Sequence, residues 1–332
     1  MSKYSVSEML SFLMCRRMWD FNSPHRQNLE PIGANVNLWF GSAIHRGLEL
    51  FYGEGAPIHA GFREYIDKKL EEGAIEQGIE LDSKLELGLE MLKGYKNWTA
   101  TEDKVYFDKV IQTEFEFKLP ILDPEGNETG DYYVGTIDGI VEDDLGRYWL
   151  LEHKTASSIS VDHLAYDMQI VAYMYAAQQI HDIKIEGVLY NTLLKKTPTT
   201  PKTVYSGKHL STAKNIKTTY EHYYDCLVEH YGSEEKIPMD RYEEILGILK
   251  RRGNDFFHRV RVRKTQAEME DVAHRIYLIT RDMKDPTIYP NCNKFGACPY
   301  LCDFKEVCIE MNTGRDASFI LDSMYQEREK RY

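Results

Sequence analysis

The order of segments between residues 105 and 193 limits the fold of this chain more than any other feature. Five stretches there have a clear strand or helix pattern, in the order strand 105–119, strand 132–142, strand 148–152, helix 162–180 and strand 185–193. Asp143–Asp144–Leu145–Gly146, between the second and third stretches, is typical of a hairpin turn. This β-β-β-α-β order predicts an α/β fold in which helices flank a mixed central sheet.

Helical patterns precede this sheet, and two further regions follow it. Ser5 and Glu8 have the spacing of a capping box at the start of a first helix, and a second helix is predicted from about Gly41 to Tyr52. The predicted division is N-terminal helices and an α/β core at 1–195, a mainly helical insertion with a basic strand at 196–285, and a cysteine-rich tail at 286–332.

Two carboxylates and a lysine are predicted to meet where neighbouring strands end. Glu152 and Lys154 are two residues apart, so on a strand their side chains point to the same face. Across the hairpin, Asp138 lies at a similar height on the adjacent strand. Two adjacent carboxylates form a hard-oxygen site for Mg²⁺ or Mn²⁺. The spacing alone also fits a simpler arrangement, in which Asp138 caps a turn and Glu152 pairs with Lys154 at the surface.

These three residue types are the ones that phosphodiester hydrolysis requires. A divalent ion polarises the phosphoryl oxygen and lowers the pKa of an attacking water. A lysine beside it orients that water or neutralises charge in the transition state. Asp138 together with Glu152-x-Lys154 resembles the motif of the PD-(D/E)XK nucleases.

Two further motifs resemble the RecB-type branch of that family. Gly41–Ser42–Ala43–Ile44–His45 is similar to its G-x-x-x-H element. Gln169–Ile170–Val171–Ala172–Tyr173 is similar to its Q-x-x-x-Y element, whose two ends share one helix face. The resemblance implies a restriction-endonuclease-like core. It also implies the roles of the site residues, namely metal binding by His45, Asp138, Glu152 and the main-chain carbonyl of His153, and catalysis by Asp138, Glu152, Lys154, Gln169 and Tyr173.

The cysteines gather near the end of the sequence. Of the six in the chain, four lie between Cys292 and Cys308, and in a reducing compartment such a group is typical of metal binding rather than of disulfides. Cys298, Cys302 and Cys308 can bind one metal centre, which needs a fourth ligand. Cys226 stands apart and is predicted to be a buried small hydrophobic residue.

The fourth ligand is suggested by resemblance. Cys15 is similar to the early cysteine of iron–sulfur members of the family, among them AddB and CRISPR-associated adaptation nucleases, which hold a [4Fe–4S] cluster with one early and three late cysteines. The gap of three residues between Cys298 and Cys302 departs from the commoner C-x2-C-x5-C form and resembles the version in some tailed-phage exonucleases. Cys292 in place of Cys298 is one alternative, and a structural Zn²⁺ site is another.

The charge distribution points to a local surface for DNA. A net charge of −12 argues against a general nucleic-acid coat protein. Between Lys250 and Lys264, however, seven Lys or Arg residues stand against one acid, and alternation places Arg259, Arg261 and Arg263 on one strand face. This strip is predicted to contact phosphates, although a basic edge strand that prevents aggregation has the same pattern. Weaker candidates are Lys195, Lys196 and Lys202.

The sequence therefore predicts a metal-dependent DNA nuclease, which the resemblance suggests is an exonuclease of phage type in DNA processing or recombination. Its expected partners are single-stranded or end-containing duplex DNA and, since no P-loop is present, a separate helicase or recombination protein. No apolar stretch approaches the roughly 20 residues of a membrane span, so a cytoplasmic location is expected, in the host if the protein is phage-encoded. A non-catalytic DNA-binding or assembly subunit and a structure-specific endonuclease are the alternatives.

Overall fold

A mixed sheet of six strands forms the centre of the computed structural model, which describes all residues except 33–35, 76, 102–106, 294–295, 301 and 329–332. The strands lie in the order β1 (Lys3–Ser5), β4 (Glu128–Glu142), β5 (Tyr148–Ala156), β6 (Ile185–Leu194) and β9 (Phe257–Val262), and β3 (Lys109–Leu122) also pairs with β4. The β1–β4 and β5–β6 pairs are parallel, and the other pairs are antiparallel. The predicted α/β fold with a mixed sheet is confirmed. The predicted start of the first strand, at residue 105, lies outside the described residues.

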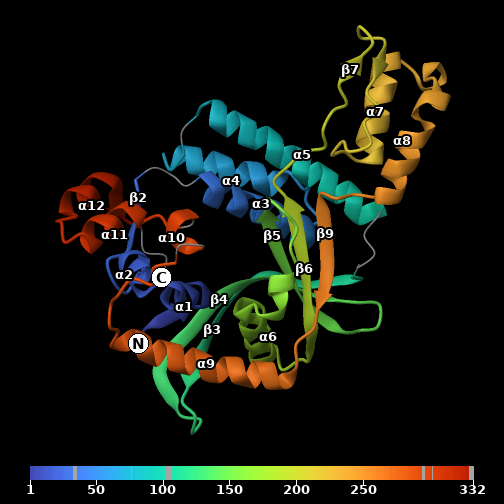
Figure 1. Cartoon of the computed structure of the whole chain (residues 1–332). Coiled ribbons are helices and arrows are strands. Elements are labelled where there is room, and N and C mark those ends of the chain that lie inside the picture. Colours follow the sequence, from blue (N-terminus) through green and yellow to red (C-terminus); the bar gives the residue numbers. More distant parts are fainter. Residues whose placement is uncertain (33–35, 76, 102–106, 294–295, 301, 329–332) are drawn as a thin grey trace.

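Helices cover both faces of the sheet (Figure 1). One layer contains α1 (Val6–Met14), α6 (Met168–His181) and α9 (Gln266–Lys284), and the other contains α3 (Val36–Glu54), α4 (Ala60–Glu71) and α5 (Ile79–Thr101). Successive strand side chains point to opposite faces, so Leu150 packs in the cluster under α6 while Leu151 packs against Tyr52 of α3. Both leucines are buried, as expected of strands covered on two sides. Among the described helices, none is long and apolar enough to cross a membrane.

The insertion is smaller than the sequence suggests. Strand β9 pairs with β6 in the central sheet, and α9 packs against α6, so both belong to the core although the predicted insertion ran to residue 285. The remaining part has its own hydrophobic cluster, which includes Tyr223 and Tyr242. Its elements are the hairpin strands β7 (Thr203–Val204) and β8 (His209–Leu210), and the helices α7 (Tyr220–Tyr231) and α8 (Met239–Arg252). It projects from the core beyond one end of α5 (Figure 1).

The two ends of the chain pack together. The first helical region is divided into α1 and α2 (Arg16–Asn22) by Cys15, whose backbone is extended. The tail contains α10 (Ala297–Tyr300), α11 (Lys305–Asn312), α12 (Ser318–Met324) and β10 (Tyr325–Glu327), and β10 pairs with β2 (Leu29–Pro31). Phe21 stacks on Phe304 with ring centroids 5.0 Å apart. A small hydrophobic cluster therefore joins residues near Cys15 to the tail.

Candidate active site and cysteine cavity

The carboxylates meet where strands β4 and β5 separate. Regular pairing between these strands ends at Gly139 and Leu151, so Asp138 and Glu152 come directly after the last pair. The backbone N–H of His153 donates a hydrogen bond of 2.7 Å to Asp138 Oδ2 across the opening. The separation leaves room between two strands, each of which carries one of the carboxylates within its length.

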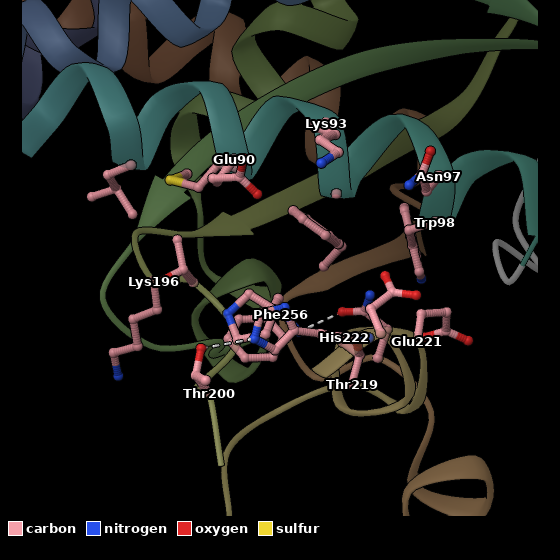
Figure 2. A pocket seen from close by; sticks show the side chains of 18 of the residues that line it. Glu90, Lys93, Asn97, Trp98, Lys196, Thr200, Thr219, Glu221, His222 and Phe256 are labelled. Carbon is pink, nitrogen blue, oxygen red and sulfur yellow. Dashed lines mark hydrogen bonds between the residues drawn. The ribbon is translucent and has the colours of Figure 1, made fainter. Parts of the chain in front are cut away.

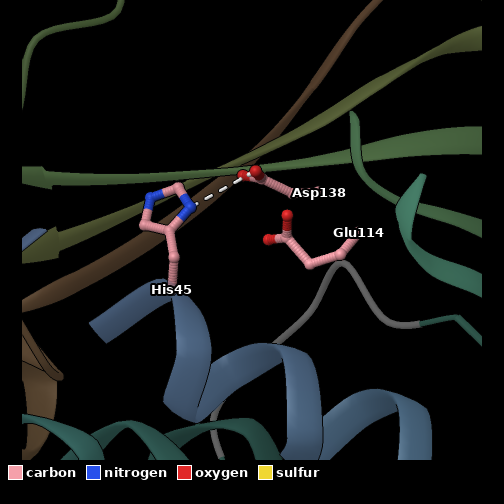
Figure 3. Close-up of side chains that lie close together, drawn as sticks. All are labelled: His45, Glu114 and Asp138. Carbon is pink, nitrogen blue, oxygen red and sulfur yellow. Dashed lines mark ion pairs between the residues drawn. The ribbon is translucent and has the colours of Figure 1, made fainter. Parts of the chain in front are cut away.

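His45 reaches this opening from α3. Its Nδ1 lies 3.3 Å from Asp138 Oδ1 (Figure 3). Burial disfavours the charged imidazole, but the Asp138 carboxylate outweighs burial and raises the pKa of His45 to about 9. For Asp138, burial of the carboxyl group is outweighed by His45 and by the N–H of His153, which hold its pKa well below the usual range. Without a cation, the two side chains form an ion pair.

Glu152 and Lys154 occupy the same face of β5, as their spacing predicts. Lys154 Nζ forms an ion pair with the buried Glu152 carboxylate and a weak hydrogen bond of 3.4 Å with Gln169 Oε1 of α6. Gln169 in turn donates to the hydroxyl of Tyr173 at 3.1 Å. Burial and then the nearby Asp138 raise the pKa of Glu152 to about 7. The structure thus brings the residues of all four motifs into one site.

Glu114 is a member of this site that the sequence did not reveal. It lies on β3 opposite Asp138, between the pairs Thr113–Gly139 and Phe115–Ile137. Its backbone is left-handed (φ 44°), which is unusual for a non-glycine residue. Burial and the charge of Asp138 raise the pKa of Glu114 to about 7. Among the described His, Cys, Asp and Glu residues, one group of three has ligand atoms that all lie within 4.8 Å of one another. It consists of His45, Glu114 and Asp138 (Figure 3).

A buried network of polar side chains contacts the imidazole of His153. Asn191 Nδ2 lies 2.8 Å from His153 Nδ1, and the ring of Tyr52 stacks on the imidazole with an interplanar angle of 11°. Burial lowers the pKa of His153 to about 3, so the ring is neutral and accepts this hydrogen bond. Tyr95 accepts from Asn191 at 3.0 Å and from the Arg259 guanidinium at 2.7 Å. The network holds the backbone of His153, whose N–H orients Asp138.

The predicted phosphate strip is only partly exposed. Arg259 is 6% exposed and donates to two tyrosine hydroxyls, so its predicted contact with DNA phosphates is wrong. Arg261 and Arg263 are exposed, and their guanidinium groups lie over the ring of Trp149 at 5.3 and 5.5 Å. They occupy the face of the sheet opposite to Lys154. Their contact with DNA stays a prediction.

Cysteines from both ends of the chain line a common cavity of about 700 Å³. They are Cys15, Cys292, Cys298, Cys302 and Cys308, and none of them forms a disulfide. Burial raises the pKa of the Cys302 thiol, and the neighbouring Cys15, Cys298 and Cys308 raise it further. Within the described part of the chain, their sulfurs do not form a group held within 4.8 Å.

Several donors point at these sulfur atoms. The backbone N–H of Asn291 lies 3.3 Å from the sulfur of Cys15, and that of Asn293 lies 3.1 Å from the sulfur of Cys298. Arg17 Nη1 approaches the sulfur of Cys308 at 3.5 Å, although the two residues are 291 positions apart. Such donors stabilise thiolates more than thiols.

Two comparisons with known proteins gave a match. The chain matches the family model of the PD-(D/E)XK nuclease superfamily over residues 3–309. Among solved structures it is similar to a candidate exonuclease from Eubacterium rectale, with 10% identity, a TM-score of 0.45, and coverage of 91% of this chain and 86% of that one. A comparison with curated proteins gave no match.

Proposed function

The chain belongs to the PD-(D/E)XK nuclease superfamily, and we propose that it is a deoxyribonuclease that uses Mg²⁺ or Mn²⁺ and digests DNA from an end. The observation that carries the proposal is the convergence of Asp138, Glu152 and Lys154 with His45 where two strands separate. Digestion from an end follows from the resemblance of the four motifs to the RecB-type branch. A role in recombination, beside a separate helicase, follows from the same resemblance.

The residues present fit a divalent cation. The carboxylates of Glu114, Asp138 and Glu152 converge with the imidazole of His45. Mn²⁺ binds both kinds of ligand, and Mg²⁺ prefers the carboxylate oxygens. Burial and then the charge of Asp138 raise the pKa values of Glu114 and Glu152, and a bound divalent ion would favour the charged form of both carboxylates. A bound divalent ion would supply Lewis acidity at the phosphoryl oxygen and a lower pKa for the attacking water.

The other residues position these groups. The N–H of His153 holds one oxygen of Asp138, and the other oxygen, which pairs with His45 in the free protein, would bind the cation. Gln169 and Tyr173 hold the Lys154 ammonium beside the carboxylates. Glu152 keeps the pKa of Lys154 above its usual range in spite of burial, so the lysine stays charged and can neutralise charge on a phosphate in the transition state.

Glu114 is proposed as an additional metal ligand. Replacing Glu114 with Gln should weaken Mn²⁺ binding by about tenfold or more, because one charged oxygen ligand is lost from the site. The measurement is isothermal titration calorimetry on the full chain. Glu116→Gln is the matched control, since this residue lies two positions away on the same strand and is exposed. Equal affinities for the two variants would exclude Glu114 as a ligand.

Metal binding should depend on pH. His45 must be neutral to bind a cation, but in the free protein its pKa is about 9, so the cation has to displace a proton. Below pH 9 the apparent affinity for Mn²⁺ should therefore rise with pH, by about tenfold per unit for one displaced proton. Titrations at several pH values between 7 and 9 would measure this slope. His45→Gln should flatten it, and a flat slope in the unchanged protein would contradict ligation by His45.

We propose a [4Fe–4S] cluster for the cysteine cavity, held by Cys15, Cys298, Cys302 and Cys308. Four thiols with backbone and guanidinium donors around one cavity are the donor set that such a cluster takes. A single tetrahedral Zn²⁺ would bring its sulfurs to within about 3.8 Å of one another. A [4Fe–4S] cluster would bind each cysteine through a different iron atom, so it would not require the sulfurs to lie that close together. Cys292 also lines the cavity and remains the alternative to Cys298.

The proposed function is tested on labelled DNA. Incubation with Mn²⁺ of linear DNA labelled at the 5′ or the 3′ end, and of the same DNA as a closed circle, should give loss of the linear molecules alone. Cutting of the circle would instead favour a structure-specific endonuclease. No cutting of any DNA, with normal DNA binding, would favour a non-catalytic subunit.

A further inference from the structure

One long segment of this acidic protein contains no acidic residue. The chain has 53 Asp and Glu residues against 41 Lys and Arg, yet residues 187–220 include none of the acids. The segment carries six lysines, at positions 195, 196, 202, 208, 214 and 217. It leads from the end of β6 through the start of the insertion to α7. A local excess of positive charge of this length is typical of a surface for a polyanion.

The segment starts beside the candidate active site. The backbone N–H of Lys195 donates to the carbonyl of Ala156 at 2.8 Å, and Ala156 follows Lys154 by two positions on β5. Burial and the nearby ammonium of Lys84 on α5 lower the pKa of Lys195. Two neighbouring ammonium groups attract an anion, because a bound phosphate relieves their repulsion.

Five of the six lysines have no acidic partner among the described residues. Within the described part of the chain, no ion pair involves Lys195, Lys196, Lys202, Lys208 or Lys217, whereas Lys214 pairs with Glu244. The side chains of positions 196, 202 and 208 are exposed. We call Lys195, Lys196, Lys202 and Lys208 the lysine track.

A cavity of about 610 Å³ lies beside the lysine track, and Lys196 is one of its lining residues. It lies between α5 and the first residues of the insertion, and Figure 2 shows Lys196 on the opposite wall from Glu90. Glu221 also lines it, so the cavity interior disfavours phosphate. A polynucleotide backbone is therefore better accommodated along the exposed lysines than inside this cavity.

The far end of the track presents an aromatic ring. Tyr205 and Ser206 form the tip of the β7–β8 hairpin with left-handed backbones, at φ 51° and 58°. Turns of this kind favour Asn or Gly, so a tyrosine here is an unfavourable choice for stability alone. Tyr205 is 68% exposed, and the Arg241 guanidinium lies 4.9 Å from its ring centroid. An exposed ring beside positive charge is suited to stacking with an unpaired base.

We infer that the lysine track and Tyr205 bind a single DNA strand that extends from the active site along the insertion. The lysines contact the phosphates, and Tyr205 stacks on a base that has no partner strand. This inference rests on the proposed function, since it takes DNA as the substrate. On this inference, the insertion binds the part of the substrate strand that lies beyond the catalytic residues.

The test compares two triple variants of equal charge. Lys196, Lys202 and Lys208 are replaced with Gln in one, and the ion-paired Lys68, Lys184 and Lys214 in the other. Binding of a labelled oligothymidylate is measured by fluorescence anisotropy over a salt series, in an Asp138→Asn background that prevents cutting. The slope of log affinity against log salt should fall by about 2 in the track variant, at about 0.7 for each lost phosphate contact, and stay unchanged in the control.

Tyr205→Ala should separately lower affinity by about fivefold or more, as expected for one lost stacking contact. Equal salt slopes for the two triple variants, with tight binding by the parent protein, would overturn the track while leaving the nuclease proposal intact. A parent protein that neither binds DNA nor cuts it with Asp138 restored would instead overturn the proposed function.

Discussion

Separate replacement of Asp138, Glu152 or Lys154 by alanine is expected to lower nuclease activity by about a hundredfold or more. Each residue supplies charge where the phosphate reacts, and loss of one such preorganised group typically lowers turnover by about 10²–10³. The variants should differ in metal binding. Asp138→Ala and Glu152→Ala should weaken Mn²⁺ binding, whereas Lys154→Ala should retain it, because the charged lysine acts on the phosphate and is not a metal ligand. The measurements are turnover on labelled linear DNA and calorimetric Mn²⁺ titration.

Glu116→Ala is the control for these variants, since it removes an exposed carboxylate from the neighbouring strand β3. Thermal unfolding of every variant distinguishes loss of chemistry from loss of fold. Activity close to that of the unchanged protein in Asp138→Ala or Glu152→Ala would refute the metal site. An inactive Lys154→Ala variant that also fails to bind Mn²⁺ would show that Lys154 acts by holding Glu152 in place.

Replacement of Cys15 by alanine is expected to have the second large effect, on the iron content and the stability of the protein. Protein purified without oxygen should be brown, with broad absorbance near roughly 400 nm, and Cys15→Ala should remove the colour and the iron. The same change should destabilise α2 and the tail together. A centre shared by Cys15 and Cys308 closes nearly the whole chain into a loop, which by analogy with a disulfide removes about 6 kcal/mol of chain entropy from the unfolded state. Iron analysis and thermal unfolding measure the two consequences.

Three cysteine variants test this proposal further. Cys226→Ala should leave colour and stability unchanged, because Cys226 packs in the insertion. Loss of iron in Cys292→Ala, with a harmless Cys298→Ala, would replace Cys298 by Cys292 as the ligand. Colourless protein with about one zinc per chain would exclude the cluster and leave the nuclease proposal standing.

Local spacing was sufficient for those parts of the site that lie on one element. Glu152 and Lys154 share a face of β5, and Gln169 and Tyr173 share a face of α6, as the periods of a strand and a helix require. The order of strands and helices likewise determined the mixed sheet, since hairpin strands pair antiparallel and strands joined through a helix pair parallel. These features depend on residues close together in the chain, and the sequence records them directly.

Tertiary structure alone decided which of several equivalent residues the site uses. Glu114 and Glu116 are two positions apart on β3, so alternation assigns both side chains to the same face of the strand. Of the two, Glu114 is the one that lies beside His45. Arg259 and Arg261 also share a strand face, yet Arg259 is buried because Tyr52 and Tyr95 of α3 and α5 cover it. Alternation assigns a side chain to a face, but its burial depends on which helix packs over that position. That packing is set by contacts between residues far apart in the chain, which no local pattern contains.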